Sequence, residues 1–217
     1  MKSLMTEADL DRIKEAVATA EKQTSGEIVP YIVAQSGQHE VAVWRGAAFS
    51  AFLTYAILLV IRWFSGWGGA MVTEGIIPVL LIILASGIGA AVAQWIPSVK
   101  RCLTGQQRLA VATHQRAMQA FVEKEVFSTR ERTGILLFVS LFEHRIEVVG
   151  DTGINEKVKP EDWIQIVSII QQHMKAGRLT EGLVQGIHEC GHLLERAGVE
   201  IRSDDTNELS DDISFGL

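Results

Sequence analysis

The sequence predicts an α/β fold: a small sheet of about three to four strands, flanked by helices and interrupted by a two-helix transmembrane hairpin. Short apolar runs typical of strands alternate with segments whose apolar residues recur at helical spacing. The stretch from Val41 to Trp95 contains only three charged residues, Arg45, Arg62 and Glu74. These two observations together indicate a water-soluble α/β domain with an apolar insertion.

The N-terminal segment predicts one helix and one strand. Thr6 is a suitable N-cap, and apolar residues such as Leu10 and Ile13 follow it at a spacing of three to four residues. Residues 27–35 form a short, β-branched apolar run that is typical of a strand. Pro30 within this run argues for an edge position or a bulge, because proline cannot donate a hydrogen bond to a sheet.

Two apolar spans follow, at residues 44–64 and 75–95, each 21 residues long. A helix of about 20 apolar residues crosses a hydrocarbon core of about 30 Å. Tryptophans near the span ends suit the membrane interface, so we expect a transmembrane hairpin in preference to two buried core helices. Basic residues gather on the side opposite the connecting turn. We expect a bacterial inner-membrane protein with two spans, and the positive-inside rule predicts that both termini lie in the cytoplasm.

The remaining chain predicts three helices and two strands. We expect a helix capped by Thr104, a buried strand over 133–142, a hairpin partner over 145–150, and helices over 160–177 and 179–198.

The single strand before the hairpin cannot form a sheet alone, so it must pair with the strands that follow. We therefore predict one discontinuous α/β domain from residues 1–41 and 98–200, with the hairpin at 42–97 as an insertion. Residues 201–217 form an acidic tail that we expect to be flexible.

The charge pattern narrows the classes of function. The net charge is −6 and no basic stripe is present, so nucleic-acid binding is not expected. Cys102 and Cys190 form no C-x-x-C motif or disulfide framework. The charged N-terminus does not resemble a cleaved signal peptide.

Three blocks of the sequence resemble the TPM domain family, which includes thylakoid-lumen phosphatase-like proteins and the modulator of levamisole receptors. The blocks are "LMTEADLDRIKEAVATAEKQTSGEIVPYIV", "RTGILLFVSLFEHRIEVVGDTGINEKV" and "LTEGLVQGIHECGHLL". The hairpin departs from the family's commoner arrangement, an extracytoplasmic domain with a separate anchor. Lumenal partners are therefore not carried over to this chain.

The resemblance implies a phosphatase-like activity and a divalent cation, Ca²⁺ or Mg²⁺, held by acidic residues near the strand ends. The candidates are Asp151, Asn155 and Glu156 in the loop after the last predicted strand, joined by Glu27 at the start of the first strand. Crevices at strand ends are also where α/β sheets usually bind ligands. The alternative is that Asp151 and Asn155 only stabilise a turn.

Residues 188–192 read H-E-C-G-H and match the H-E-x-x-H signature of zinc peptidases. A helical wheel places His188 and His192 on the side opposite the apolar stripe that contains Ile187 and Cys190. No third ligand follows at the expected spacing. We interpret the match as accidental, and expect at most adventitious metal binding by the histidine pair.

These observations favour a membrane-anchored interaction module that faces the cytoplasm and aids the assembly, maintenance or regulation of membrane proteins. Its expected partners are the lipid bilayer and other membrane-protein subunits. A divalent-metal-dependent phosphatase is the alternative function, and a zinc peptidase ranks third.

Overall fold

The computed structural model describes residues 5–65, 73–199, 208–210 and 212–216. The chain forms two compact units. The first contains residues 1–37 and 110–217, and the second contains residues 38–109.

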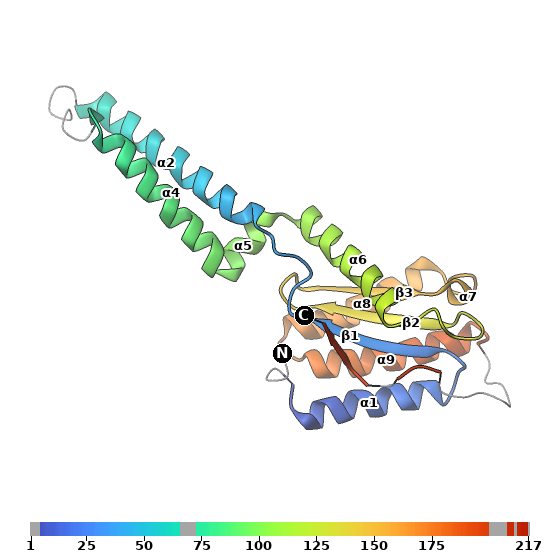
Figure 1. The fold of residues 1–217 in the computed structure, drawn as a ribbon. Helices are drawn as coiled ribbons and strands as arrows, with labels where there is room; N and C mark the ends of the chain where they lie inside the picture. The colour runs from blue at the N-terminus through green and yellow to red at the C-terminus, as the bar shows by residue number, and fades with distance from the viewer. Residues whose placement is uncertain (1–4, 66–72, 200–207, 211, 217) are drawn as a thin grey trace. The chain divides into compact units, whose positions relative to one another are not determined.

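A four-stranded sheet of order β3-β2-β1-β4 forms the centre of the first unit (Figure 1). Its strands are β1 (Glu27–Val33), β2 (Gly134–Ser140), β3 (Arg145–Gly150) and β4 (Ser214–Gly216). β1 runs parallel to β2 and to β4, whereas β3 runs antiparallel to β2. The predicted fold class is confirmed, since the strand before the hairpin pairs with a strand that follows it.

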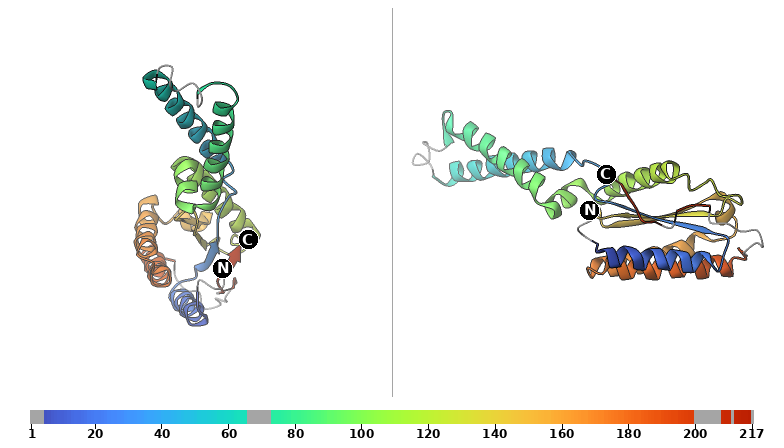
Figure 2. Two further views of the ribbon diagram at one scale, coloured as in Figure 1. Left: turned by 90° about the vertical axis from the view of Figure 1, so that its left-hand side faces the viewer. Right: turned by 60° about the horizontal axis from the view of Figure 1, so that its bottom comes forward.

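Helices cover both faces of this sheet. One face packs against α1 (Glu7–Glu21), α8 (Pro160–Lys175) and α9 (Leu179–Arg196), and Figure 2 shows α1 and α9 side by side. The other face packs against α6 (Gln106–Glu123). Every residue of β1 and β2 is buried, as expected for strands covered on both sides.

The second unit is a hairpin of α2 (Val41–Ser65) and α4 (Ile77–Trp95), followed by the short helix α5 (Pro97–Thr104). Glycine allows α2 and α4 to approach closely, because a Cβ on Gly46 would lie 2.6 Å from the Gly89 carbonyl oxygen. By length and composition, both helices could cross a membrane.

Pro30 was expected at an edge or a bulge, but its strand β1 lies between β2 and β4, and only the part of β1 before Tyr31 lacks a β4 partner. The neighbouring edge-facing N–H group, that of Ile28, donates to Glu21 Oε1 at 2.9 Å. Pro30 lies two residues further along β1 and faces the same edge, where it has no N–H group to satisfy. Among the described residues, β4 pairs with Tyr31–Val33, so its first residue lies opposite Tyr31, one position after Pro30.

The sequence did not predict β4, because it lies in the tail that we expected to be flexible. Ile213 and Phe215 alternate with polar residues and pack against the core formed by α1, α8 and α9. A strand of three residues in an acidic segment has too little periodicity to be read from sequence. Its position depends on contact with β1.

Candidate functional site

Asp151, the first candidate residue, caps the short helix α7 (Thr152–Asn155). Its Oδ1 atom accepts a hydrogen bond from the Thr152 N–H group at 2.7 Å. The residue is only 4% exposed. Its second oxygen, Oδ2, lies 2.8 Å from Nε of Arg132. One carboxylate oxygen therefore caps a helix, and the other forms an ion pair.

The turn before β2 holds Arg132 in place for this ion pair. The Arg132 backbone has a left-handed φ of 59°, and its carbonyl accepts from the Gly153 N–H group at 3.1 Å. A Cβ on Gly153 would collide with the carbonyl oxygen of Glu131. Gly153 is thus required for α7 to pack on this turn.

The two other residues of the predicted loop site point elsewhere. Asn155 Nδ2 donates to the carbonyl oxygen of Gly150 at 2.6 Å. Glu156 follows the end of α7 and is exposed. The contacts of Asp151 and Asn155 are those of the turn-stabilising alternative, and cation binding by these residues stays a prediction.

Glu27 lies at the same end of the sheet as Asp151, on the other side of the first residue of β2, Gly134. It is 7% exposed and lies opposite Gly134 in the β1–β2 register. On the other side of Gly134, the Asp151 N–H group donates to the Gly134 carbonyl at 2.9 Å. Glu27 Oε1 accepts from the Glu208 N–H group at 3.1 Å. Two buried carboxylates thus flank the first residue of β2, each already engaged by other groups.

The candidates lie at the amino ends of the parallel strands, because β3 runs antiparallel to β2. Ligands of α/β sheets usually bind at the carboxyl ends. There, the Glu143 carboxylate accepts from the Ser36 N–H group at 2.9 Å and from the Ser140 hydroxyl group. The tendency of α/β sheets to bind ligands at the carboxyl ends of their strands therefore favours the cluster of Ser36, Ser140 and Glu143, and it does not favour Asp151.

Residues 103–193 match the family model of the TPM domain. This part of the chain is therefore similar to the TPM domain. The NMR structure of BA42 protein from the psychrophilic bacterium Bizionia argentinensis is similar to this structure, with a TM-score of 0.60 and 21% sequence identity over 98% of this chain and 95% of that chain. No curated protein matches the chain.

Within these matched residues, α9 carries the H-E-C-G-H match with its histidines on the outside. His188 and His192 are exposed, whereas Cys190 is fully buried, as the helical wheel predicts. Burial raises the pKa of the Cys190 thiol to about 12. Within the part of the chain that the structure describes, no three His, Cys, Asp or Glu side chains gather as a metal site would require. The geometry gives the peptidase interpretation no support.

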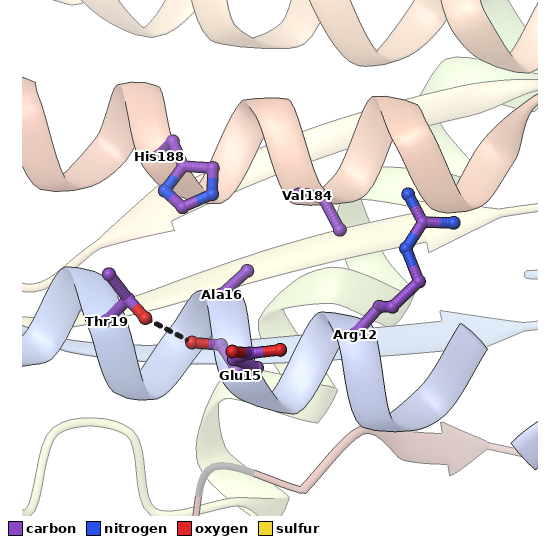
Figure 3. A pocket seen from close by; sticks show the side chains of 6 residues that line it. All are labelled: Arg12, Glu15, Ala16, Thr19, Val184 and His188. Carbon is purple, nitrogen blue, oxygen red and sulfur yellow. Dashed lines mark hydrogen bonds between the residues drawn. The ribbon is translucent and has the colours of Figure 1, made fainter. Parts of the chain in front are cut away.

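A shallow groove of about 230 Å³ runs between α1 and α9 (Figure 3). His188 points into it from α9, and Arg12 and Glu15 line it from α1. Thr19 donates to the Glu15 carbonyl at 2.6 Å along the same side. The groove was not predicted, since it depends on how two distant helices pack. It places His188 on the side of α9 that faces α1.

The structure also reveals a pair that sequence reasoning missed. His114 Nδ1 lies 3.0 Å from Glu147 Oε2, so this histidine has a carboxylate partner. The pairing follows from the packing of α6 over β3, which spacing alone does not give.

Proposed function

We propose that the chain is a membrane-anchored TPM domain on the cytoplasmic face, where it serves as an interaction module for the assembly, maintenance or regulation of membrane proteins. The observation that carries this proposal is the exposure of large apolar side chains along α2 and α4.

The hairpin helices expose far more apolar surface than water tolerates. Trp63 is 84% exposed and Trp95 is 80% exposed, and leucine, isoleucine and phenylalanine side chains are exposed between them. Extended apolar patches of this kind mark contact with a membrane or a partner. The candidate spans of 24 and 19 residues are roughly 36 and 28 Å long at the helical rise. Both lengths suit a hydrocarbon core of about 30 Å.

The charges at the two ends of the hairpin support the orientation. At the turn end, Arg62 pairs with Glu74 at 3.3 Å, so the two charges offset one another. At the other end, Arg45 donates to the Leu103 carbonyl at 2.6 Å, and α5 adds Lys100 and Arg101. The positive-inside rule favours the cytoplasm for this basic end.

The hairpin also offers a surface for a membrane subunit. An apolar groove of about 400 Å³ is lined by small and large side chains, among them Gly46, Phe49, Ala85 and Ile88. Small residues allow another helix to approach closely within a bilayer. We propose this groove as the contact with a partner subunit, so Ala85→Leu should weaken the association while Asp151→Ala leaves it intact.

The test of anchoring and orientation combines extraction with cysteine labelling. The chain should stay in the membrane pellet after alkaline carbonate treatment. In intact cells, a membrane-impermeant maleimide should label a Thr73→Cys variant at the turn end and leave the exposed Cys102 of α5 unlabelled. Release by carbonate would refute the anchor, and labelling of Cys102 from outside would refute the orientation.

The second candidate is a divalent-metal-dependent phosphatase, which the two buried carboxylates beside Gly134 favour. A cation there would have to displace Arg132 from Asp151. Titration of Ca²⁺ or Mg²⁺ into the purified chain, with calorimetric detection, tests this alternative. Binding that is lost in Asp151→Asn would support it, and the absence of saturable binding would exclude it.

A further inference from the structure

The C-terminal segment of the chain lies against β1, whose residues precede it by more than 180 positions. β4 pairs in parallel with β1, with Ser214 opposite Tyr31 and Gly216 opposite Val33. On its N-terminal side, Glu208 contacts the start of β1 and the turn before β2. Glu208–Ser210 and Asp212–Gly216, called here the tail segment, thus follow the edge of β1.

We propose that this edge of β1 is a binding site for an extended peptide of a partner protein, acidic at its N-terminal end and apolar at its C-terminal end. The tail segment is the resident occupant of this site. The proposal deepens the proposed function, on which it rests, by naming the surface through which the interaction module binds. Addition of a strand to a sheet edge is a recurring mode of peptide recognition.

The length of the site is set by β1 itself. The Ile28 N–H group is already bound by Glu21 Oε1 at 2.9 Å. Pro30 has no N–H group, so strand pairing cannot extend past it in that direction. The ladder is therefore confined to Tyr31–Val33, the three residues that pair with β4. A short, defined site of this kind selects a peptide by its flanking side chains.

The apolar end of the site requires a glycine. A Cβ on Gly216 would lie 2.6 Å from the Tyr31 hydroxyl oxygen and 2.8 Å from Cγ1 of Val33. Tyr31 cannot move aside easily, because it is buried and its hydroxyl accepts a hydrogen bond from Arg116 at 2.8 Å. On the opposite face of the sheet, the apolar side chains of Ile213 and Phe215 pack against the core formed by α1, α8 and α9.

The acidic end of the site is formed by backbone and carboxylate groups. Glu208 Oε2 accepts from the Arg130 N–H group at 2.9 Å, while the Glu208 N–H group donates to Glu27 Oε1 at 3.1 Å. Further along, Asp212 Oδ1 lies 2.7 Å from Lys14 Nζ. These groups match an acidic side chain at the start of a bound peptide, with a second acid before the strand.

The occupant is held by contacts that can exchange. Its ladder is three residues long, and Ile213 and Phe215 are only partly buried. The ion pair between Lys14 and Asp212 is exposed and screened by salt. Tethering nevertheless gives the tail segment an effective concentration on the order of millimolar. A free peptide at micromolar concentration therefore binds well only when the tail segment is released.

The experiment uses the full-length chain in detergent and a fluorescent peptide with the sequence NELSDDISFGL. Gly216→Val in the chain releases β4 by steric conflict, and Phe215→Ser is a second way of releasing it. Ser210→Thr, at an exposed position of the tail segment, is the control. Fluorescence anisotropy should show at least about tenfold tighter peptide binding to both released variants than to the wild type and the control. Amide chemical shifts of Tyr31–Val33 should change on binding.

A peptide carrying the same Gly216→Val change should bind none of these chains. Equal peptide affinity for wild-type and released chains, or equal binding of the altered peptide, would overturn the proposal. A wild-type dimer that dissociates on Gly216→Val would also overturn it, because the site would then hold the tail of a second copy. Carbonate extraction is independent of these results, so failure of the peptide site leaves the membrane anchor untouched.

Discussion

Substitutions of Asp151 separate its structural role from a role in ligand binding. Asp151→Asn keeps a side-chain oxygen for the Thr152 N–H group but removes the charge that pairs with Arg132. Asp151→Ala removes both contacts, which span 2.7 Å and 2.8 Å respectively. The two variants together therefore measure the cap and the ion pair.

The structure sets the expected magnitudes. Loss of a helix N-cap typically costs about 1 kcal/mol. The Arg132 side chain is 51% exposed, so the ion pair is screened by water and contributes at most about 1 kcal/mol. We expect Asp151→Asn to lower the free energy of unfolding of the first unit by about 0.5–1 kcal/mol, and Asp151→Ala by about 1.5–2 kcal/mol.

Urea unfolding, followed by the NMR indole signal of Trp163, measures these changes. Trp163 packs beside the end of β3, where its Cζ2 atom would lie 3.2 Å from a Cβ on Gly150. Arg132→Ala is the matched control and should resemble Asp151→Asn. Equal losses for Asp151→Asn and Asp151→Ala would refute the capping role. Unchanged stability in both, together with loss of cation binding, would instead assign Asp151 to a ligand site.

Three further predictions concern other parts of the molecule. In α4, Gly89→Val should destabilise the hairpin by about 1–3 kcal/mol in detergent unfolding, because a Cβ there would collide with α2, whereas Gly87→Val, with nothing within 4 Å, should not. Iodoacetamide at pH 8 should modify Cys102 and spare Cys190, whose pKa is raised to about 12 by burial; equal modification would contradict this packing. Hydrogen bonds from the backbone and side chain of Thr6 lower the pKa of the Asp9 carboxyl group from its ordinary value of 3.8. Protection of the amides at the start of α1 should therefore persist above pH 3.8 and be lost as the pH falls through the lowered pKa of the folded state. Asp9→Asn should abolish this pH dependence.

Helices and strands could be predicted from the sequence where the spacing of apolar residues agrees with the capping and turn residues at the ends of the element. The Thr6 cap and the spacing after it gave the helix that the structure places at Glu7–Glu21, and the apolar run over 133–142 gave β2. The strand over 145–150 matches β3. β4 and α7 were missed, because elements of three and four residues have no measurable period and depend on tertiary contacts.

The candidate site was predictable in residue type but not in contacts. Sequence identified Asp151 and Asn155 as either ligands or turn residues. The partner of Asp151 could not be read, because Arg132 reaches it from a left-handed backbone conformation in another turn. The contact between Glu27 and Glu208 was likewise hidden, since it joins residues 181 positions apart.

This last contact connects the tail segment to the alternative function. Release of β4 by Gly216→Val should separate the Glu208 N–H group from Glu27 Oε1. If Glu27 and Asp151 serve a cation, release should raise the affinity for Ca²⁺ or Mg²⁺ relative to the wild type, as measured by calorimetry. If Glu27 only anchors the tail segment, release should lower the stability of the first unit without creating a cation site. Tighter peptide binding with unchanged cation affinity would therefore favour the interaction module over the phosphatase.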